Sequence, residues 1–217
     1  MIEHHFEVPR TARFYTLGEI EAASDVWFVL HGYSMLARNF LKWFEPARAP
    51  GRLIVAPEAL SRSYFDERKA RRVGASWMTK ELREAEIEDY VGYLDLLAAR
   101  IFAGVGQRPR VELHGFSQGA VTAARWAALG QTAFDRIVLW GGSTPPDLEL
   151  ARLGRAVAGG ELQLIVGETD QYLTNELVSA EMQRLEAAEI PARLTRFAGG
   201  HAVDRETLCR LASVPPG

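Results

Sequence analysis

The chain has 217 residues, of which 47% are hydrophobic and 24% charged, and its formal net charge is -3. The length and composition fit one globular domain, residues 1–217, around a single sizeable core. The slightly acidic balance argues against a nucleic-acid-binding protein, because such proteins need a basic face to displace counterions from phosphates.

The opening residues and the cysteine content bear on the compartment. Cys209 is the single cysteine, so the chain has no intramolecular disulfide, which fits a reducing environment. The first ten residues carry acids and histidines where a signal peptide would have a basic end and an apolar run. No uninterrupted apolar stretch is long enough to span a bilayer. We therefore expect a cytoplasmic protein with no membrane span.

Apolar strands alternate with helical patterns after an N-terminal hairpin, which we expect around Pro9 and Arg10. Strands are expected at 25–32, 52–58, 109–115, 135–142, 161–170 and 192–201. Helices are expected at 84–102, 119–130, 174–190 and 204–213. This alternation is typical of a mostly parallel sheet covered on both faces by helices.

Polar residues that directly follow strands are the first candidates for a site, because ligands bind at the carboxyl ends of the strands in such sheets. These residues are His31, Glu58, Ser117, Asp170 and His201. The aromatic residues within strands and helices are expected in the core instead. They are Trp27, Phe28, Trp126 and Trp140.

Ser117 lies in the sequence GFSQG, between Gly115 and Gly119, where a strand is expected to become a helix. This is the G-x-S-x-G pattern of a nucleophile elbow. The serine needs a tight, strained turn to project above the sheet, and larger side chains at the two glycines would collide with a neighbouring strand and helix. The N–H of Gln118 then lies at a helix N-terminus, where it could hold an oxyanion.

A serine nucleophile needs a base and an acid, in the chain order Ser, acid, His. His201 is the only histidine after Ser117 and is therefore the candidate base. Asp170 follows the preceding strand and is the favoured acid, with Glu168 and Asp147 as alternatives. These residues predict acyl transfer from an ester or thioester through an acyl-enzyme.

The second oxyanion donor is expected in HGYSM, after the strand 25–30. The N–H of Tyr33 is the candidate, and Gly32 lets the backbone approach the site. We expect His31 to have a structural role. A metal site formed by His31 and His114 is disfavoured, because no cysteine or carboxylate stands near them at the spacing of a metal ligand. No metal and no cofactor are expected.

Four motifs in order, FVLHGY, GFSQGAV, VGETD and AGGHAVD, resemble the phospholipase/carboxylesterase family of α/β-hydrolases. This family includes bacterial carboxylesterases and acyl-protein thioesterases. The resemblance implies an α/β-hydrolase fold and the same roles for the residues proposed above. The segment APEALSRSYF…GASWM also resembles the family and implies a place for Trp77 near the acyl site.

Three departures from the family pattern border the acyl site and leave the substrate open. The chain reads HGYSMLAR where the family has a glycine and an acid soon after His-Gly. Val166 stands where the family has a histidine before the glycine of its acid motif. Ala120 replaces the family's second glycine after the glutamine.

The expected covering of the site bears on substrate size. The connection 141–160 allows one helix and no cap domain, so the site should be fairly open and partly covered by the loop 58–77. We therefore expect substrates with short to medium acyl chains. Arginines of this loop could attract an anionic leaving group, but a solvated charged loop is favoured. They are Arg62, Arg68, Arg71 and Arg72.

The leading hypothesis is a serine carboxylesterase or thioesterase that acts on a small-molecule substrate, as a monomer or a homodimer. The same triad could act on amide or carbon–carbon bonds, because the triad does not fix the leaving group. A non-catalytic binding protein with this fold is the alternative from a different class.

Overall fold

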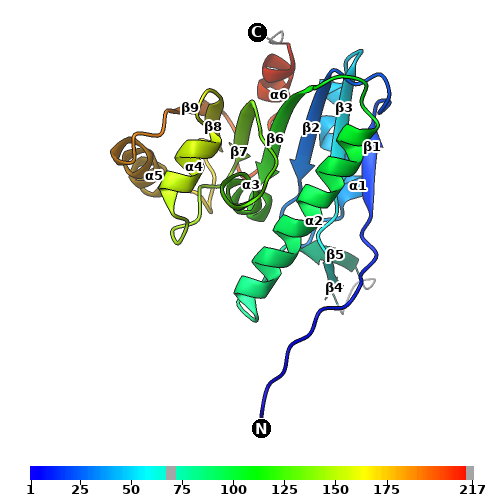
Figure 1. The fold of residues 1–217 in the computed structure, drawn as a ribbon. Coiled ribbons are helices and arrows are strands. Elements are labelled where there is room, and N and C mark those ends of the chain that lie inside the picture. Colours follow the sequence, from blue (N-terminus) through cyan, green and yellow to red (C-terminus); the bar gives the residue numbers. More distant parts are fainter. Residues whose placement is uncertain (67–71, 214–217) are drawn as a thin grey trace.

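The computed structural model describes residues 1–66 and 72–213 and is built on a seven-stranded sheet (Figure 1). β1 pairs antiparallel with β3, and the other neighbouring strands are parallel, which confirms the predicted sheet. The strands in spatial order are β1 (Phe14–Leu17), β3 (Arg52–Pro57), β2 (Asp25–Leu30), β6 (Arg110–Phe116), β7 (Arg136–Trp140), β8 (Glu161–Gly167) and β9 (Ala192–Phe197).

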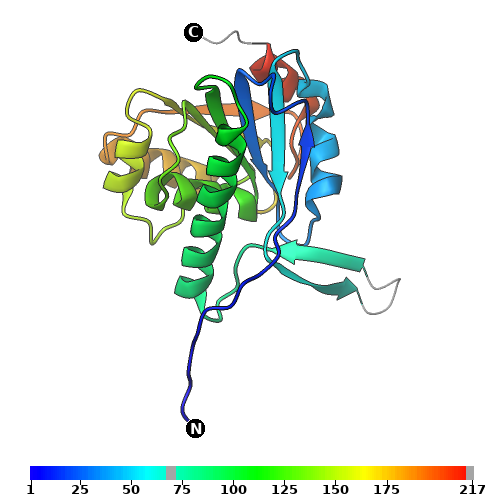
Figure 2. The ribbon, with the colours of Figure 1, turned by 45° about the vertical axis from the view of Figure 1, so that its right-hand side comes forward.

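Helices cover both faces of the sheet (Figures 1 and 2). Alternate residues of β2 point to opposite faces. Val26 and Phe28 pack in a core with α2, α3 and α4, and Trp27 and Val29 pack in a second core with α1, the 3-10 helix η1 and α6. The helices are α1 (Ala37–Leu41), η1 (Lys42–Ala47), α2 (Arg83–Ala103), α3 (Gln118–Leu129), α4 (Leu150–Ala156), α5 (Asn175–Ala187) and α6 (Arg205–Ala212).

The predicted core aromatics are confirmed, whereas the predicted N-terminal hairpin is wrong. Trp27, Phe28, Trp126 and Trp140 are fully buried. Residues 1–13 form no strand, and β1 pairs with β3 instead. The alternating pattern before Pro9 has no apolar surface to cover, so its large side chains stay exposed.

A two-stranded hairpin, β4 (Ser61–Asp66) and β5 (Arg72–Ser76), replaces the loop expected at 58–77. It projects from the body of the molecule near the start of α2 (Figure 2). Ala75 of β5 pairs with Met35, so the hairpin is attached to the segment that follows β2. The connection after β7 holds one helix, α4, as expected.

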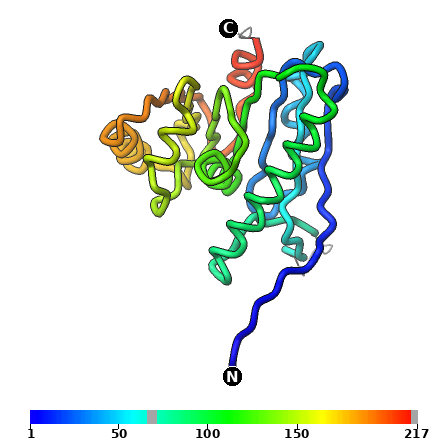
Figure 3. The backbone as a smooth tube through the Cα atoms, viewed as in Figure 1, coloured from blue at the N-terminus to red at the C-terminus, as the bar shows by residue number. Residues whose placement is uncertain are grey.

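The topology creates a switch point between β2 and β6. The chain leaves β2 for β3 on one side, and returns through α2 to β6 on the other side (Figure 3). Leu30 of β2 pairs with Gly115 of β6, so the two strands end side by side. Ligands bind at such points in open α/β sheets. Within residues 1–66 and 72–213, no helix has the length and apolar character needed to cross a bilayer.

Candidate active site

Ser117 occupies the turn between β6 and α3, with φ 55° and ψ -117°. A non-glycine residue in this region of backbone space costs about 1–3 kcal/mol and persists only where the surroundings enforce it. Here the Ser117 N–H donates to the Trp140 carbonyl of β7 at 2.9 Å, and the Ala120 N–H donates to the Ser117 carbonyl at 2.9 Å. The turn is therefore held on both sides.

The two glycines of the motif are required by the close approach of backbone atoms. A Cβ on Gly115 would lie 2.2 Å from the Gly119 carbonyl oxygen, at the start of α3. A Cβ on Gly119 would lie 2.2 Å from the Leu30 carbonyl oxygen, at the end of β2. The predicted collisions with helix and strand are confirmed, and they explain why the elbow permits no side chain at these two positions.

Asp170 and His201 form a hydrogen-bonded pair, although they come from the ends of different strands. His201 Nδ1 lies 2.8 Å from Asp170 Oδ2. The other carboxylate oxygen accepts from the N–H groups of Tyr172, at 2.8 Å, and Leu173, at 3.1 Å. Burial opposes ionisation, but the bonds from His201 and from these N–H groups outweigh it and hold the pKa of Asp170 below its usual range. The carboxylate is fixed in position and charged.

The His201 ring lies between two aromatic side chains next to the elbow. The ring centroid of Phe116, the residue before Ser117, is 4.8 Å away, and that of Tyr172 is 4.7 Å away. Gly141, with φ 53°, leaves room for the ring, since a Cβ there would lie 3.0 Å from two imidazole atoms. Because Nδ1 is bonded to Asp170, Nε2 is the nitrogen left to exchange protons with a substrate or nucleophile.

The Ser117 hydroxyl and the His201 ring do not hydrogen-bond to each other in this structure. Such contacts are often long in free enzymes and shorten when a substrate binds. The structure therefore places Ser117, Asp170 and His201 at one edge of the sheet and joins the last two directly.

The two candidate oxyanion donors follow neighbouring strands. Tyr33 lies three residues after the end of β2, and Gln118 lies two residues after the end of β6. In the part of the chain that the structure describes, neither backbone N–H donates to a protein acceptor. The Tyr33 side chain is 56% exposed and packs on Phe65 of β4.

The backbone beside Tyr33 is held by β5. Ser34 has φ 57°, and its N–H donates to the Ala75 carbonyl at 2.9 Å, while the Ala75 N–H donates to the Met35 carbonyl at 3.0 Å. A Cβ on Gly74 would lie 2.4 Å from the Ser34 carbonyl oxygen. The unpredicted hairpin thus fixes the loop that carries one candidate donor.

The Gln118 side chain joins the start of α3 to the segment after β5. Its oxygen accepts from the Trp77 N–H at 3.1 Å, and its nitrogen donates to the Met78 carbonyl at 2.9 Å and to Ser76 Oγ at 3.1 Å. The sequence analysis assigned a role to the backbone of Gln118 only. The glutamine after Ser117 was visible in the sequence, but its hydrogen-bond partners were not.

Trp77 and His31 support this loop from below. The Trp77 side chain is 3% exposed, and its indole N–H donates to the His31 carbonyl at 2.8 Å. The buried Trp77 ring therefore stabilises the loop. Its contact with a substrate stays a prediction. His31 has the structural surroundings expected of it: its Nδ1 lies 2.8 Å from the Gly32 carbonyl, and its Nε2 accepts from the Ala59 N–H at 3.1 Å. Burial lowers the pKa of His31 to about 4, so the ring is neutral.

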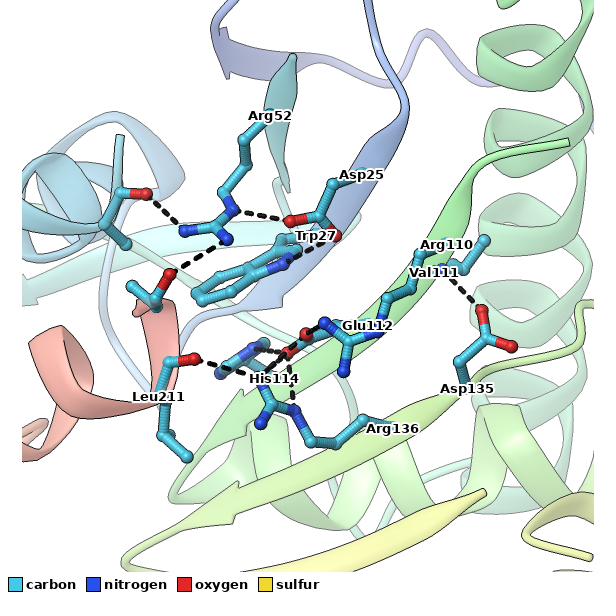
Figure 4. A network of polar contacts seen from close by, with 12 residues as sticks. Asp25, Trp27, Arg52, Arg110, Val111, Glu112, His114, Asp135, Arg136 and Leu211 are labelled. Atoms are coloured by element: carbon cyan, nitrogen blue, oxygen red, sulfur yellow. Dashed lines mark hydrogen bonds and ion pairs between the residues drawn. The ribbon is translucent and has the colours of Figure 1, made fainter. Parts of the chain in front are cut away.

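His114 belongs to a buried polar network on the other face of the sheet (Figure 4). Its Nε2 lies 3.1 Å from Glu112, and its Nδ1 accepts from the Trp140 indole at 3.2 Å. Arg136 binds Glu112 at 2.7 Å and also donates to the Leu211 carbonyl, at the end of α6. Both nitrogens of His31 and of His114 are thus bonded to protein groups, which leaves neither ring a nitrogen for a metal.

Neither alternative acid is hydrogen-bonded to His201. Asp147 binds Arg83 at 2.7 Å and Arg125 at 2.9 Å. Glu168 is exposed. Of the three candidates, Asp170 is the one hydrogen-bonded to His201.

Glu58 and the described arginines of the loop 58–77 have protein partners. Glu58 is buried and binds Arg13 at 2.6 Å and Arg62 at 3.3 Å. Arg72 donates to the Ser34 carbonyl at 3.4 Å. Arg68 and Arg71 lie outside the described residues. The hypothesis of an anionic leaving group at this loop therefore stays a prediction.

Sequence reasoning did not identify Tyr172 and Gly141. Tyr172 is two residues after Asp170, and Gly141 directly follows β7, so each lies in a loop at this edge of the sheet. Their places close to Asp170 and directly after a strand could be seen in the sequence, but nothing in the sequence showed that either residue contacts His201.

No family model and no curated protein matches the chain. Several solved structures do. Acyl-protein thioesterase 2 from Zea mays has a TM-score of 0.70 and 14% identity, over 93% of this chain and 96% of its own. Esterase PE8 has a TM-score of 0.71 and 24% identity, over 93% and 96%. A phospholipase/carboxylesterase from Dyadobacter fermentans has a TM-score of 0.66 and 14% identity, over 95% and 98%. The chain therefore has the α/β-hydrolase fold.

Proposed function

We propose that the protein is a serine hydrolase that cleaves carboxylic esters, thioesters included, with short to medium acyl chains. One observation carries the proposal. Ser117 occupies a strained turn at the end of β6, and the hydrogen-bonded pair of His201 and Asp170 lies against the residue before it. The esterases and thioesterases among the structural neighbours support it.

Each residue has a role that follows from its position. His201 Nε2 takes the proton of Ser117, and Ser117 Oγ attacks the ester carbonyl carbon. Asp170 keeps the proton of the ring on Nδ1 and stabilises the imidazolium that forms. The backbone N–H groups of Tyr33 and Gln118 hold the oxyanion.

The cycle closes with further proton transfers through the same histidine. The imidazolium of His201 gives its proton to the leaving oxygen or sulfur, which leaves an acyl group on Ser117. Water, deprotonated by His201, then attacks the acyl-enzyme, and the imidazolium returns this proton to Ser117 Oγ as the acid is released. This chemistry needs no metal and no cofactor. An open site beneath a single helical connection suits substrates of modest size.

The first test compares wild type with Ser117→Ala on p-nitrophenyl esters from acetate to laurate. Loss of a triad nucleophile lowers kcat by roughly 10^4 to 10^6. Ser179→Ala is the matched control, because Ser179 is exposed on α5 away from the site. A fluorophosphonate probe should label wild type and the control variant but not Ser117→Ala.

The two readouts separate the competing functions. Turnover and labelling that both depend on Ser117 support the hydrolase, and the profile over chain length gives the size of the acyl site. Equal turnover by Ser117→Ala would contradict the proposal. Absence of both turnover and labelling in folded wild type would favour a non-catalytic binding protein.

A further inference from the structure

A cavity of about 300 Å³ begins at Gln118, the residue after Ser117. One wall is the face of α3 that starts at Gln118 and continues through Val121, Thr122 and Arg125, at helical spacing. The segment 143–147, which follows Gly142, forms another wall, and Met78 and Arg83 complete the lining. A Cβ on Gly142 would lie 3.0 Å from the Ser117 carbonyl oxygen, so both walls start at the elbow.

The cavity and the surroundings of His201 are formed by different residues. The His201 ring contacts Phe116, Asp170 and Tyr172, and none of these lines the cavity. A leaving group must lie beside His201 to receive its proton. The cavity is therefore available to the part of the substrate that remains on Ser117.

The far part of the cavity is charged. The Arg125 side chain is 4% exposed, and its Nη2 lies 2.9 and 3.2 Å from the two oxygens of Asp147. Arg83 binds the same carboxylate at 2.7 Å. Two guanidinium groups thus share one carboxylate within the lining. The second partner of Arg83, Glu84, is 79% exposed, so solvent screens it.

The lining also contains apolar side chains, those of Met78, Val121, Pro145 and Pro146. Arg125 is seven residues after Gln118, about 10 Å further along α3, and its side chain leans back toward the N-terminus of the helix. Its Nη1 donates to Met78 Sδ at 3.3 Å. A chain of a few methylene groups spans the distance that remains. The cavity thus combines apolar side chains with two guanidinium groups.

The hydroxyl of Tyr90 lies next to this polar cluster. Tyr90 is 1% exposed and does not line the cavity. Burial raises the pKa of Tyr90 to about 12, while the nearby charges of Arg125 and Arg83 act in the opposite direction.

We propose that this cavity receives an acyl group that ends in a carboxylate, which binds the two guanidinium groups of Arg83 and Arg125. The preferred substrates are then half-esters or half-thioesters of short dicarboxylic acids. This inference rests on the proposed hydrolase function and names its substrate class. Hydrolysis releases the dicarboxylate and the alcohol or thiol.

The test compares kcat/KM for 4-nitrophenyl hydrogen glutarate with that for its neutral methyl ester, 4-nitrophenyl methyl glutarate. Wild type should prefer the anionic ester about tenfold. Arg83→Gln should lower this preference about threefold to tenfold, mainly through KM, and Asp147→Asn should raise it, because a competing carboxylate is removed. Arg152→Gln is the control, since Arg152 is an exposed arginine paired with Glu149 outside the cavity. It should leave the preference unchanged.

Arg83→Gln and Asp147→Asn should change the preference for the anionic ester in opposite directions. Misfolding of the variants would not produce this pair of results. Added salt should also reduce the preference. A neutral ester cleaved as well as the anionic one would overturn the inference and leave the hydrolase function standing. If neither ester is cleaved, the function itself fails, and calorimetry with monomethyl glutarate decides about the site. Weaker binding by Arg83→Gln supports it, and equal or absent binding overturns it.

Discussion

Two histidine–carboxylate pairs at the parallel sheet have similar geometry and different surroundings. His201 lies 2.8 Å from Asp170, and His114 lies 3.1 Å from Glu112. The His201 side chain is 17% exposed, whereas His114 is fully buried and stacked on Trp27 with ring centroids 4.5 Å apart. Both pairs lie at the parallel sheet, and only their neighbours distinguish them.

The difference lies in the second nitrogen of each ring. In His114 this nitrogen accepts from the Trp140 indole, and burial outweighs the nearby Glu112 and lowers the pKa of the ring. In His201 it is unbonded among the described residues and lies beside the elbow. A hydrogen-bonded carboxylate is thus insufficient for general-base chemistry, because the base also needs a free nitrogen that a substrate can reach.

Replacement of each histidine should give opposite results, and this is the largest expected effect. His201→Ala should lower kcat by roughly 10^4 to 10^6 with little change in stability. His114→Ala should lower the free energy of unfolding by about 3 kcal/mol, because it opens a cavity and leaves Glu112 and Trp140 short of a partner. Ester turnover and urea unfolding measure the two effects. A comparable loss of kcat in folded His114→Ala protein would refute the distinction.

The two carboxylates should separate in the same way, with a smaller effect on turnover. Asp170→Asn should lower kcat by about 10^4, because the ring loses its orientation and the stabilisation of its charge. Glu112→Gln leaves Arg136 buried without a carboxylate, which should cost about 3–5 kcal/mol of stability. The same two measurements apply. A stability loss for Asp170→Asn as large as for Glu112→Gln would show that both carboxylates are mainly structural.

A third histidine sharpens the comparison through pH. The pKa of His31 is about 4 in the folded protein and 6.5 when the ring is free, so the unfolded chain binds a proton first as the pH falls. The stabilisation is present above about pH 6.5 and should decline by about 1.4 kcal/mol per pH unit down to about pH 4. Urea unfolding at about pH 7, 6 and 5 should show a flatter profile for His31→Gln. Parallel profiles would mean that folding does not lower the pKa of His31.

Local sterics explain why much of the fold and the strained turn at Ser117 could be predicted. The alternation of apolar strands with helices fixed the parallel sheet, and the polar residues after strands fell at its carboxyl edge. The glycines around Ser117 report backbone contacts within a strand, a turn and a helix, so a short stretch of sequence carries that information. The prediction of an N-terminal hairpin was wrong because an alternating pattern forms a strand only where an apolar surface is available for its apolar side chains to pack on.

Contacts between distant segments needed the tertiary structure. The sequence offered Asp170, Glu168 and Asp147 as acids, and only the packing of two strand ends placed Asp170 on His201. The hairpin β4–β5 contacts the backbone of Ser34, which comes from a distant part of the chain. No local sequence pattern predicts this contact. The burial of Trp77 and its hydrogen bond to the His31 carbonyl likewise depend on distant segments.

The sequence by itself determined the sheet, the turn at Ser117 and the candidates for a triad, because these follow from periodicity and from steric limits within a few residues. The tertiary structure decided which carboxylate meets His201, why His114 differs from it, and where Arg83, Arg125 and Asp147 converge. Hydrogen bonding, burial and charge at these places depend on groups brought together from separate parts of the chain, and no short pattern encodes that meeting.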